Sequence, residues 1–494
     1  MKQPNILFVM TDQQRFDTLA ALGNTLVHTP NLDRLVRRGV SFTNAYSTCP
    51  VCVPARYTIR SGCEPIHTGI FTNGCVSAPA AWSTTMEDRC GPFLARRMRG
   101  LGYRTFGIGK FHTEPWDQDL GFDVHLHSEE LYEDARQRAG DAYARFIHDK
   151  HPEYDWIDML QGERSEMYYV PQMSPLPAAL TVEAWAADRV VDQLRRTDDP
   201  RPYFGFVSFI GPHPPCAPPQ PFNRLHNPDE MPNPVVGDLA VDHADDYIPW
   251  MNHGIWAEDV SNGWARVLKA RYYGEIAYID QCLGSILDAV EARPDAANTV
   301  ICFFADHGDM LGDHHGWQKE SFFEASCHVP LLVSWPVRLK AGIRCHELAC
   351  LTDLFGIATA AAGSPECRDG IDLLGMLEGK KAPRQEVIGT YGRPGTPRFK
   401  IMVRAGDWKY IYIANGAREQ FFNVAEDPGE RVECAAMHAD RVAACRIRAI
   451  AALRGPIGRD ALDGDALRAF PFAPIPRRRI LQFDQARGVK GFGL

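Results

Sequence analysis

The sequence contains no long hydrophobic run. Near its start, the apolar stretch Ile6–Met10 is short and gives way to Asp12, whereas the hydrophobic region of a secretory signal has about 7–15 apolar residues. No segment approaches the roughly 20 apolar residues that a membrane-spanning helix requires. These two absences predict a cytoplasmic protein with no membrane partner.

The sequence also lacks concentrated positive charge. The net charge at pH 7 is -9 and the sequence pI is about 6.0, and no basic stripe runs along the chain, which argues against a nucleic-acid partner. The run Arg477–Arg479 is isolated at the start of the C-terminal tail RRRILQFDQARGVKGFGL. We interpret the run as a solvated or subunit-contact segment. The apolar tail could dock on a neighbouring subunit or on its own domain, so a homo-oligomer is one expectation.

The fourteen cysteines form no complete zinc pattern. Cys49 and Cys52 make a Cys-x-x-Cys pair, but a zinc site needs a second ligand pair, which the sequence does not provide. Pro50 inside the pair, followed by Pro54 and Arg56, also disfavours a thioredoxin-type redox motif. We expect most cysteines to be reduced and Cys49 to be a buried apolar residue. Cys52 requires another explanation.

Continuous apolar runs are the most prominent feature that is present. Such runs are typical of strands buried in a parallel sheet, and five occur: Asn5–Met10, Arg104–Ile108, Tyr203–Phe209, Thr299–Phe304 and Val329–Trp335. Amphipathic helical patterns lie between them, at Asn31–Arg38, Ala55–Ser61 and Trp264–Ala292. This alternation predicts an α/β fold with a large, mostly parallel sheet flanked by helices.

The pattern changes at about residue 376. Strand-like segments at Glu386–Tyr391, Lys400–Arg404 and Trp408–Ile413 precede a helical segment around Val432–Leu453. They predict a smaller α+β domain with an antiparallel sheet. We therefore divide the 494 residues into an α/β domain, 1–375, and a C-terminal domain with its tail, 376–494.

A proline-rich segment, residues 212–262, interrupts the first domain. We interpret it as an insertion that loops over the sheet and forms a candidate substrate wall. Its aromatic residues Tyr247, Trp250 and Trp256 could stack on a sugar, enclose a quaternary ammonium group or pack the loop itself.

Polar, chargeable residues follow the apolar runs. In an open α/β sheet, ligands bind beyond the carboxyl ends of the strands. Four of the runs are followed there by these groups: Asp12 with Gln13, Lys110 with His112, His213, and Asp306 with His307. The carboxylate and amide oxygens suit Ca²⁺, Mg²⁺ or Mn²⁺, and the imidazole leaves Mn²⁺ or Zn²⁺ open. The cations Arg56, Lys110 and Lys319 suit an anionic ester.

The motifs together resemble a known family. Cys52-Val53-Pro54-Ala55-Arg56, with Gly62 further on, resembles the signature of the type I sulfatases, which belong to the alkaline phosphatase superfamily. Four more segments resemble family motifs in family order: NILFVMTDQ, GIGKFH, FIGPHPP and FFADHGDMLGDHHGWQKESFFEASCHVPLL. The segment AGDWKYIYI…EQFFNVAEDPGE is similar to the family's C-terminal domain. The resemblance covers nearly the whole chain and implies an alkaline-phosphatase-like fold.

Three positions depart from the common sulfatase pattern. Gln13 stands where many sulfatases have a second Asp, His307 where many have Asn, and Ala55 where Ser is common. In having Gln at position 13, the chain also resembles the phosphonate monoester hydrolases of the same superfamily. Those enzymes usually lack a Lys-x-His pair, so Lys110 and His112 favour sulfate esters.

The resemblance implies a mechanism. A formylglycine-generating enzyme would oxidise Cys52 to Cα-formylglycine, whose hydrate has two hydroxyls. One hydroxyl attacks the sulfur of the ester, and deprotonation of the other then regenerates the aldehyde and expels sulfate. A serine has no second hydroxyl and could not complete this cycle.

The resemblance also implies a role for each site residue. Asp12, Gln13, Asp306, His307 and residue 52 would hold one divalent metal ion, of which we favour Ca²⁺, with Mn²⁺ or Mg²⁺ as alternatives. Arg56 would steady the hydroxyls and His112 would take a proton from the second one. Lys110, His213 and Lys319 would bind the substrate, and His213 or one of the lysines would assist the leaving group. Asn73 is a further pocket candidate.

The expected activity is therefore hydrolysis of a small sulfate ester. Aryl, choline, alkyl and sugar sulfates all remain open. The alternatives are a phosphonate monoester or phosphodiester hydrolase on the same scaffold, and a non-catalytic binder of sulfated ligands with an unconverted Cys52.

Overall fold

A computed structural model describes residues 2–73, 86–130, 132, 134–155, 169–237 and 260–474. Its centre is an eight-stranded sheet of order β4-β3-β5-β1-β6-β7-β2-β8. The strands are β1 Asn5–Thr11, β2 Val40–Tyr46, β3 Arg104–Gly109, β4 Val124–His127, β5 Tyr203–Ser208, β6 Thr299–Ala305, β7 Leu331–Ser334 and β8 Ile343–Cys350. All neighbouring pairs are parallel except those that involve β7. The predicted mixed, mostly parallel sheet is confirmed.

The five predicted strands are all present, with one error of direction. Val329–Trp335 was expected to be parallel, but its strand β7 runs antiparallel to both β6 and β2. A continuous apolar run indicates that a strand is buried on both faces of the sheet. It does not indicate whether the strand runs parallel or antiparallel to its neighbours. Strands β2, β4 and β8 were not predicted because polar residues interrupt them: VSFTNAY, VHLH and IRCHELAC.

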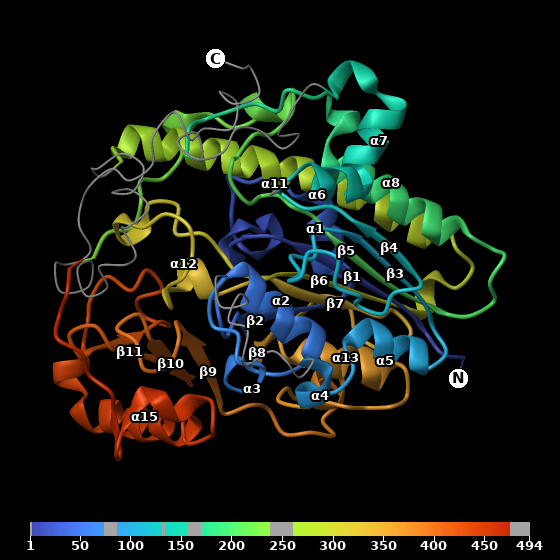
Figure 1. The fold of residues 1–494 in the computed structure, drawn as a ribbon. Helices are drawn as coiled ribbons and strands as arrows, with labels where there is room; N and C mark the ends of the chain where they lie inside the picture. The colour runs from blue at the N-terminus through green and yellow to red at the C-terminus, as the bar shows by residue number, and fades with distance from the viewer. Residues whose placement is uncertain are drawn as a thin grey trace.

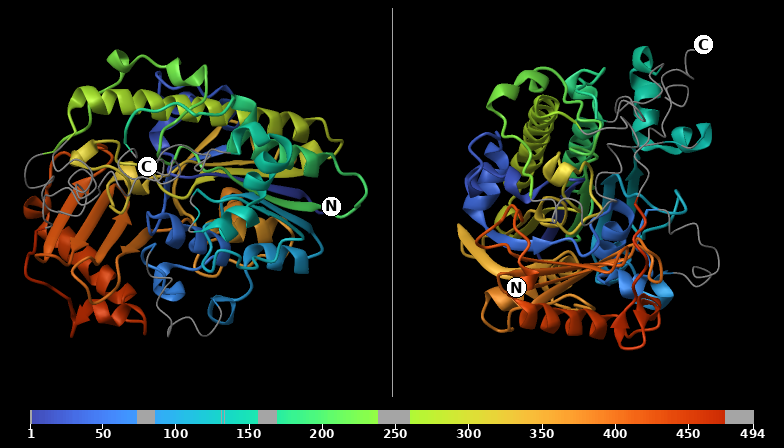
Figure 2. Two further views of the ribbon diagram at one scale, coloured as in Figure 1. Left: turned by 45° about the horizontal axis from the view of Figure 1, so that its top comes forward. Right: turned by 90° about the vertical axis from the view of Figure 1, so that its left-hand side faces the viewer.

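Helices cover both faces of the sheet (Figures 1 and 2). Residues Leu7 and Val9 of β1 pack toward α1 Pro30–Arg38, α8 Val182–Arg195 and α11 Asn262–Glu291. Ile6, Phe8 and Met10 alternate with them and pack toward α2 Cys52–Ser61, α5 Leu94–Gly100 and α13 Asp353–Ala361. The shorter helices are α3 Pro65–Thr68, α4 Met86–Cys90, α6 Ala135–Gly140, α7 Ala142–Lys150, α12 Glu324–Cys327 and α14 Leu373–Leu377.

A second sheet lies in the C-terminal region. It is antiparallel, in the order β12-β11-β10-β9, with β9 Glu386–Tyr391, β10 Lys400–Ala405, β11 Trp408–Ile413 and β12 Arg418–Asn423. On one face Val403 packs with residues of α15 Ala439–Ala452. On the other face Met402 shares a core with Tyr46 and Val51 of the larger unit. A two-stranded ribbon, β13 Leu462–Asp463 and β14 Ala466–Leu467, follows.

The α+β character of this region is confirmed, and the domain boundary between residues 375 and 376 stays a prediction. In the described part of the insertion, residues 212–237 and 260–262, the chain forms short 3₁₀ turns at Phe222–Arg224 and Pro228–Glu230. Tyr247, Trp250, Trp256 and the tail from Arg477 onward lie outside the described residues.

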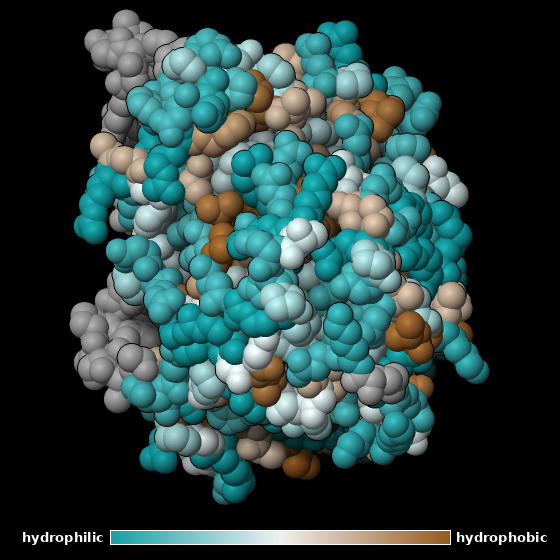
Figure 3. All heavy atoms as spheres, turned by 90° about the vertical axis from the view of Figure 1, so that its right-hand side faces the viewer, coloured by the Kyte–Doolittle hydropathy of each residue, from teal (hydrophilic) through white to brown (hydrophobic). Residues whose placement is uncertain are grey.

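The surface seen in Figure 3 is largely polar, and the described cysteines are not joined in disulfides. The face in Figure 3 is mostly hydrophilic, with small scattered apolar patches. No helix among the described residues has both the length and the apolarity to cross a bilayer. No disulfide joins two of the described cysteines, and all of these except Cys367 are buried.

Candidate active site

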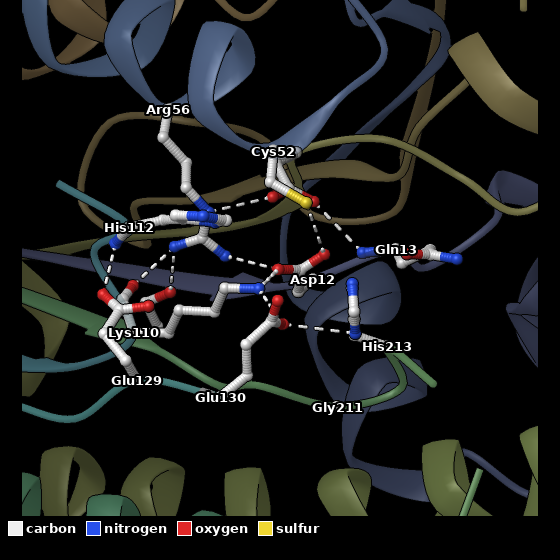
Figure 4. Close-up of polar contacts among 12 residues, drawn as sticks. Asp12, Gln13, Cys52, Arg56, Lys110, His112, Glu129, Glu130, Gly211 and His213 are labelled. Atoms are coloured by element: carbon white, nitrogen blue, oxygen red, sulfur yellow. Dashed lines mark hydrogen bonds and ion pairs between the residues drawn. The ribbon is translucent and has the colours of Figure 1, made fainter. Parts of the chain in front are cut away.

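Polar side chains meet at the carboxyl ends of five parallel strands. Asp12 follows β1, Lys110 follows β3, Glu130 follows β4, His213 follows β5 and Asp306 follows β6. Strands in parallel end at one edge, and ligands bind beyond that edge in α/β sheets. The structure thus brings the predicted residues together at one edge of the sheet, and Figure 4 shows most of these side chains.

Four residues could hold a metal ion together. One ligand atom from each of Asp12, Cys52, Asp306 and His307 lies within 4.8 Å of the others, and all four residues are fully buried. Cys52 Sγ lies 3.2 Å from His307 Nε2 and 3.8 Å from Asp12 Oδ1. Burial and the charge of Asp12 raise the pKa of Asp306. Two buried carboxylates with an imidazole are a donor set that fits one divalent cation.

Gln13 belongs to the same cluster, but its side chain contacts other groups. Its amide Oε1 accepts a hydrogen bond from Lys319 Nζ at 2.7 Å, and its Nε2 donates to Asp309 Oδ2 at 2.5 Å. Its backbone N–H donates to Asp306 Oδ1 at 3.0 Å. Gln13 therefore positions Lys319 and Asp306 in this structure, and its assignment as a metal ligand stays a prediction.

Two cations keep Asp12 ionised. Lys110 Nζ donates to Asp12 Oδ2 at 2.5 Å, and Arg56 Nη2 donates to the same atom at 2.9 Å. Arg56 Nε also donates to Asp306 Oδ2 at 3.1 Å. Burial alone would raise the pKa of Asp12, but Lys110, His213 and Arg56 hold it well below its ordinary value. Asp12 is therefore held in its charged form, which is the form that could bind a cation.

Helix α2 places Cys52 at the centre of the cluster. The helix begins at Cys52, directly after the extended Val51, and ends at Gly62. Asn73 Oδ1 accepts the Val53 N–H at 2.9 Å, which satisfies one of the free N–H groups at the start of the helix. Asn73 thus caps α2 from outside it, and its expected contact with substrate stays a prediction.

Cys52 itself lies among cations. Burial and Asp12 would raise the pKa of its thiol, but Lys319, Lys110 and His307 outweigh them and hold it well below the ordinary value. Position 52 therefore favours a negatively charged group, whether a thiolate or an ionised hydroxyl.

Lys319, His213 and Glu130 form a chain across the site. Lys319 Nζ donates to His213 Nε2 at 3.0 Å, and His213 Nδ1 lies 3.2 Å from Glu130 Oε2. Glu130 in turn accepts a hydrogen bond from Lys110 Nζ. Burial lowers the pKa of His213 to about 4, with Glu130 acting in the opposite direction. The chain links the two lysines that the sequence identified separately.

His112 lies at the same strand end as Lys110 but is held through its backbone. Its N–H donates to Glu129 Oε1 at 2.5 Å, and its Nδ1 has no hydrogen-bond partner among the described residues. Glu129 also accepts from the Phe111 N–H, at 3.1 Å. The chain turns into this segment at Gly109, where φ is +101. Only glycine fits at this position, because a Cβ there would lie 2.1 Å from the Ser208 carbonyl oxygen. The expected role of His112 as a base stays a prediction.

Glu129 and Glu130 were missed by the sequence analysis. They follow β4, whose four residues VHLH include two histidines and no continuous apolar run. The available signal was the pair of adjacent acids in HSEE, one short strand after the Lys-x-His segment. A pair of acids on its own is more often solvated than part of a site, so the signal was weak.

The fold and the site together define a hydrolase of the alkaline phosphatase superfamily. The family model described as Sulfatase matches residues 4–364 of the chain. The chain therefore belongs to the sulfatase family, and it is a sulfuric ester hydrolase.

Individual relatives are distant but nearly full-length. The chain is 28% identical over 442 residues to the arylsulfatase of Clostridium perfringens, covering 87% of this chain and 89% of that protein. It is 28% identical over 456 residues to the choline-sulfatase of Rhizobium meliloti, covering 87% and 81%. The phosphonate monoester hydrolase of Agrobacterium radiobacter has a similar fold, with a TM-score of 0.73, 24% identity and coverage of 90% and 96%.

Proposed function

We propose that this enzyme hydrolyses small sulfate monoesters through a Cα-formylglycine made from Cys52, with one divalent metal ion. The observation that carries the proposal is the position of Cys52. It starts α2 within hydrogen-bond reach of His307, between two buried carboxylates, and four residues ahead of Arg56. A buried cysteine in such surroundings has no evident structural purpose.

The ion would be held by Asp12, Asp306, His307 and residue 52, with Gln13 as a further candidate. Carboxylate oxygens favour Ca²⁺, and the imidazole keeps Mn²⁺ open, with Mg²⁺ as a third candidate. When bound, the ion would lower the pKa of a hydroxyl on residue 52 and neutralise charge on the ester.

The protein's own groups would carry the remaining steps. Arg56 orients the carboxylates and the hydroxyls of residue 52, and Lys110 and Lys319 bind ester oxygens. Lys319 donates to His213, and this pair would supply a proton to the departing alcohol. His112 takes the proton of the second hydroxyl, so that the carbon–oxygen bond breaks, sulfate leaves and the aldehyde returns.

The relatives named arylsulfatase and choline-sulfatase support a small sulfate ester as substrate. We infer that the protein matures by the action of a formylglycine-generating enzyme in the cytoplasm. The second candidate function is hydrolysis of phosphonate monoesters or phosphodiesters. It is favoured by Gln13, the position at which the chain resembles the phosphonate monoester hydrolases.

Mass spectrometry and one substitution test the proposal. The peptide that contains residue 52 should have the lower mass of the aldehyde in place of the thiol. Cys52→Ser should lose turnover of an aryl sulfate almost completely, because a sulfated serine has no second hydroxyl. Cys367→Ser, at a half-buried cysteine outside the site, serves as the control and should keep the parental rate.

An unmodified, thiol-reactive Cys52 in fully active enzyme would contradict the proposal, as would a Cys52→Ser variant with parental activity. Comparing kcat/KM for an aryl sulfate and a phenyl phosphonate monoester then separates the main activity from the alternative.

A further inference from the structure

Glu130 places a carboxylate inside a site that otherwise gathers cations around an anionic substrate. Its side chain is 10% exposed, and Oε2 accepts from Lys110 Nζ and lies 3.2 Å from His213 Nδ1. Figure 4 shows it directed between these two groups, beside Asp12. Both neighbours are proposed ligands of the ester oxygens. Any oxygen that they hold would therefore lie roughly 6 Å or less from the Glu130 carboxylate, two hydrogen-bond lengths away.

Lys110 contacts two carboxylates. Its ammonium donates to Asp12 Oδ2 at 2.5 Å and also to Glu130 Oε2. A second carboxylate weakens the attraction of this lysine for an anionic substrate. An effect that opposes binding of the substrate requires a reason of its own.

The balance of charge supplies that reason. A divalent ion would match Asp12 and Asp306. Arg56, Lys110 and Lys319 then supply the positive charge of the site, and Glu130 offsets part of it beside the ester. Each further negative charge on the ester is therefore less well compensated. A dianionic ester would add an uncompensated negative charge to a buried site, where such a charge is costly.

We propose that Glu130 is a specificity-determining residue that selects monoanionic esters over dianionic ones. The inference rests on the proposed function. A sulfate monoester carries one negative charge, whereas a phosphate monoester carries nearly two above its second pKa of about 6. The product, inorganic sulfate, is also a dianion, so the same carboxylate weakens its retention and helps it to leave.

The test replaces Glu130 by glutamine, which keeps the shape and removes the charge. We compare kcat/KM for 4-nitrophenyl sulfate, a phenyl phosphonate monoester and 4-nitrophenyl phosphate, with the metal-loaded enzyme and above the second phosphate pKa. In Glu130→Gln, the ratio of phosphate to sulfate activity should rise at least tenfold. This is the effect of a charge interaction strong enough to shift a pKa by one unit. The monoanionic phosphonate ester should change in parallel with the sulfate. Glu130→Asp, which retains the charge, should stay within threefold of the parental ratio.

A merely structural role would lower all three activities together and leave the ratio unchanged, and that result would overturn the inference. A ratio that rises equally in Glu130→Asp would overturn it too. Failure of the parent to hydrolyse the sulfate would instead contradict the proposed function, so the two failures are distinguishable.

Equilibrium binding provides a readout that does not depend on turnover. Calorimetric titration of the metal-loaded protein with inorganic sulfate, a dianion, should show at least tenfold tighter binding in Glu130→Gln than in the parent. Methyl sulfate, a monoanion, should gain less than threefold. Equal gains for the two ligands would show that charge selection does not reside at Glu130.

Discussion

Asp12 illustrates how one side chain organises the site. Its Oδ2 accepts hydrogen bonds from Lys110 and Arg56, and its Oδ1 lies 3.8 Å from Cys52 Sγ and 3.6 Å from His307 Nε2. The residue was identified from the sequence because it follows a continuous apolar run. Its partners could be named but not connected, because they come from separate strands and from α2.

His213 is the residue at which the chemistry of the leaving group can be tested. It accepts a hydrogen bond from Lys319, and we propose that this pair supplies a proton to the departing alcohol. His213→Gln should lower kcat/KM about 10²-fold for an alkyl sulfate, the magnitude typical of a general acid. The loss should be much smaller for 4-nitrophenyl sulfate, whose leaving group needs no proton.

The measurement is a series of sulfate esters of increasing leaving-group pKa, with Lys319→Met as the comparison. Equal losses across the series for His213→Gln would assign the residue to binding and not to proton transfer. If only the Lys319→Met variant showed a loss that depends on the leaving group, Lys319 would be identified as the proton donor.

At the scale of elements, helix α2 determines whether Cys52 and Arg56 face Asp12 and Asp306. Every residue of α2 is buried, and Gly62 ends the helix at φ +68. A Cβ on Gly62 would lie 2.8 Å from Cβ of Phe355 on α13. The position therefore requires glycine both for its left-handed conformation and for its contact with α13.

Gly62→Ala should lower the free energy of unfolding by about 2 kcal/mol, of which about 1 kcal/mol is the left-handed strain of a residue with a Cβ. Gly363→Ala is the matched control. Gly363 also has a positive φ, of +80, but no atom lies within 4 Å of its added Cβ. Urea unfolding of both variants measures the difference, and equal losses would show that the contact with Phe355 relaxes without cost.

At the scale of the whole molecule, the site joins parts of the chain that are far apart in sequence. The ligand cluster unites Asp12 after β1, Cys52 on α2 and Asp306 with His307 after β6. A cation bound there would connect these elements only in the folded state. Ligand binding to the folded state alone stabilises it by about 2.7 kcal/mol at a concentration 100 times the dissociation constant.

Removal of divalent cations with a chelator should therefore lower Tm by a few degrees, and re-addition of Ca²⁺ should restore it. Parallel titrations with Mn²⁺ and Mg²⁺ rank the candidate ions by how far each one restores Tm. Asp306→Asn, which removes one carboxylate ligand, is the control and should show a much smaller response. A parental Tm that no divalent ion changes would contradict the metal assignment.

The sequence by itself determined the α/β class, the five buried strands and the residues that follow them, because burial on both faces of a sheet leaves a continuous apolar run in the chain. It also determined the family, through motifs whose order survives low overall identity. Tertiary structure decided the reversed direction of β7 and the placement of β2, β4 and β8. It also decided that Glu130 enters the site between Lys110 and His213. The direction of a strand and its position in the sheet depend on its contacts with other segments, several of which are more than a hundred residues away in the sequence. The local amino-acid composition does not indicate those contacts.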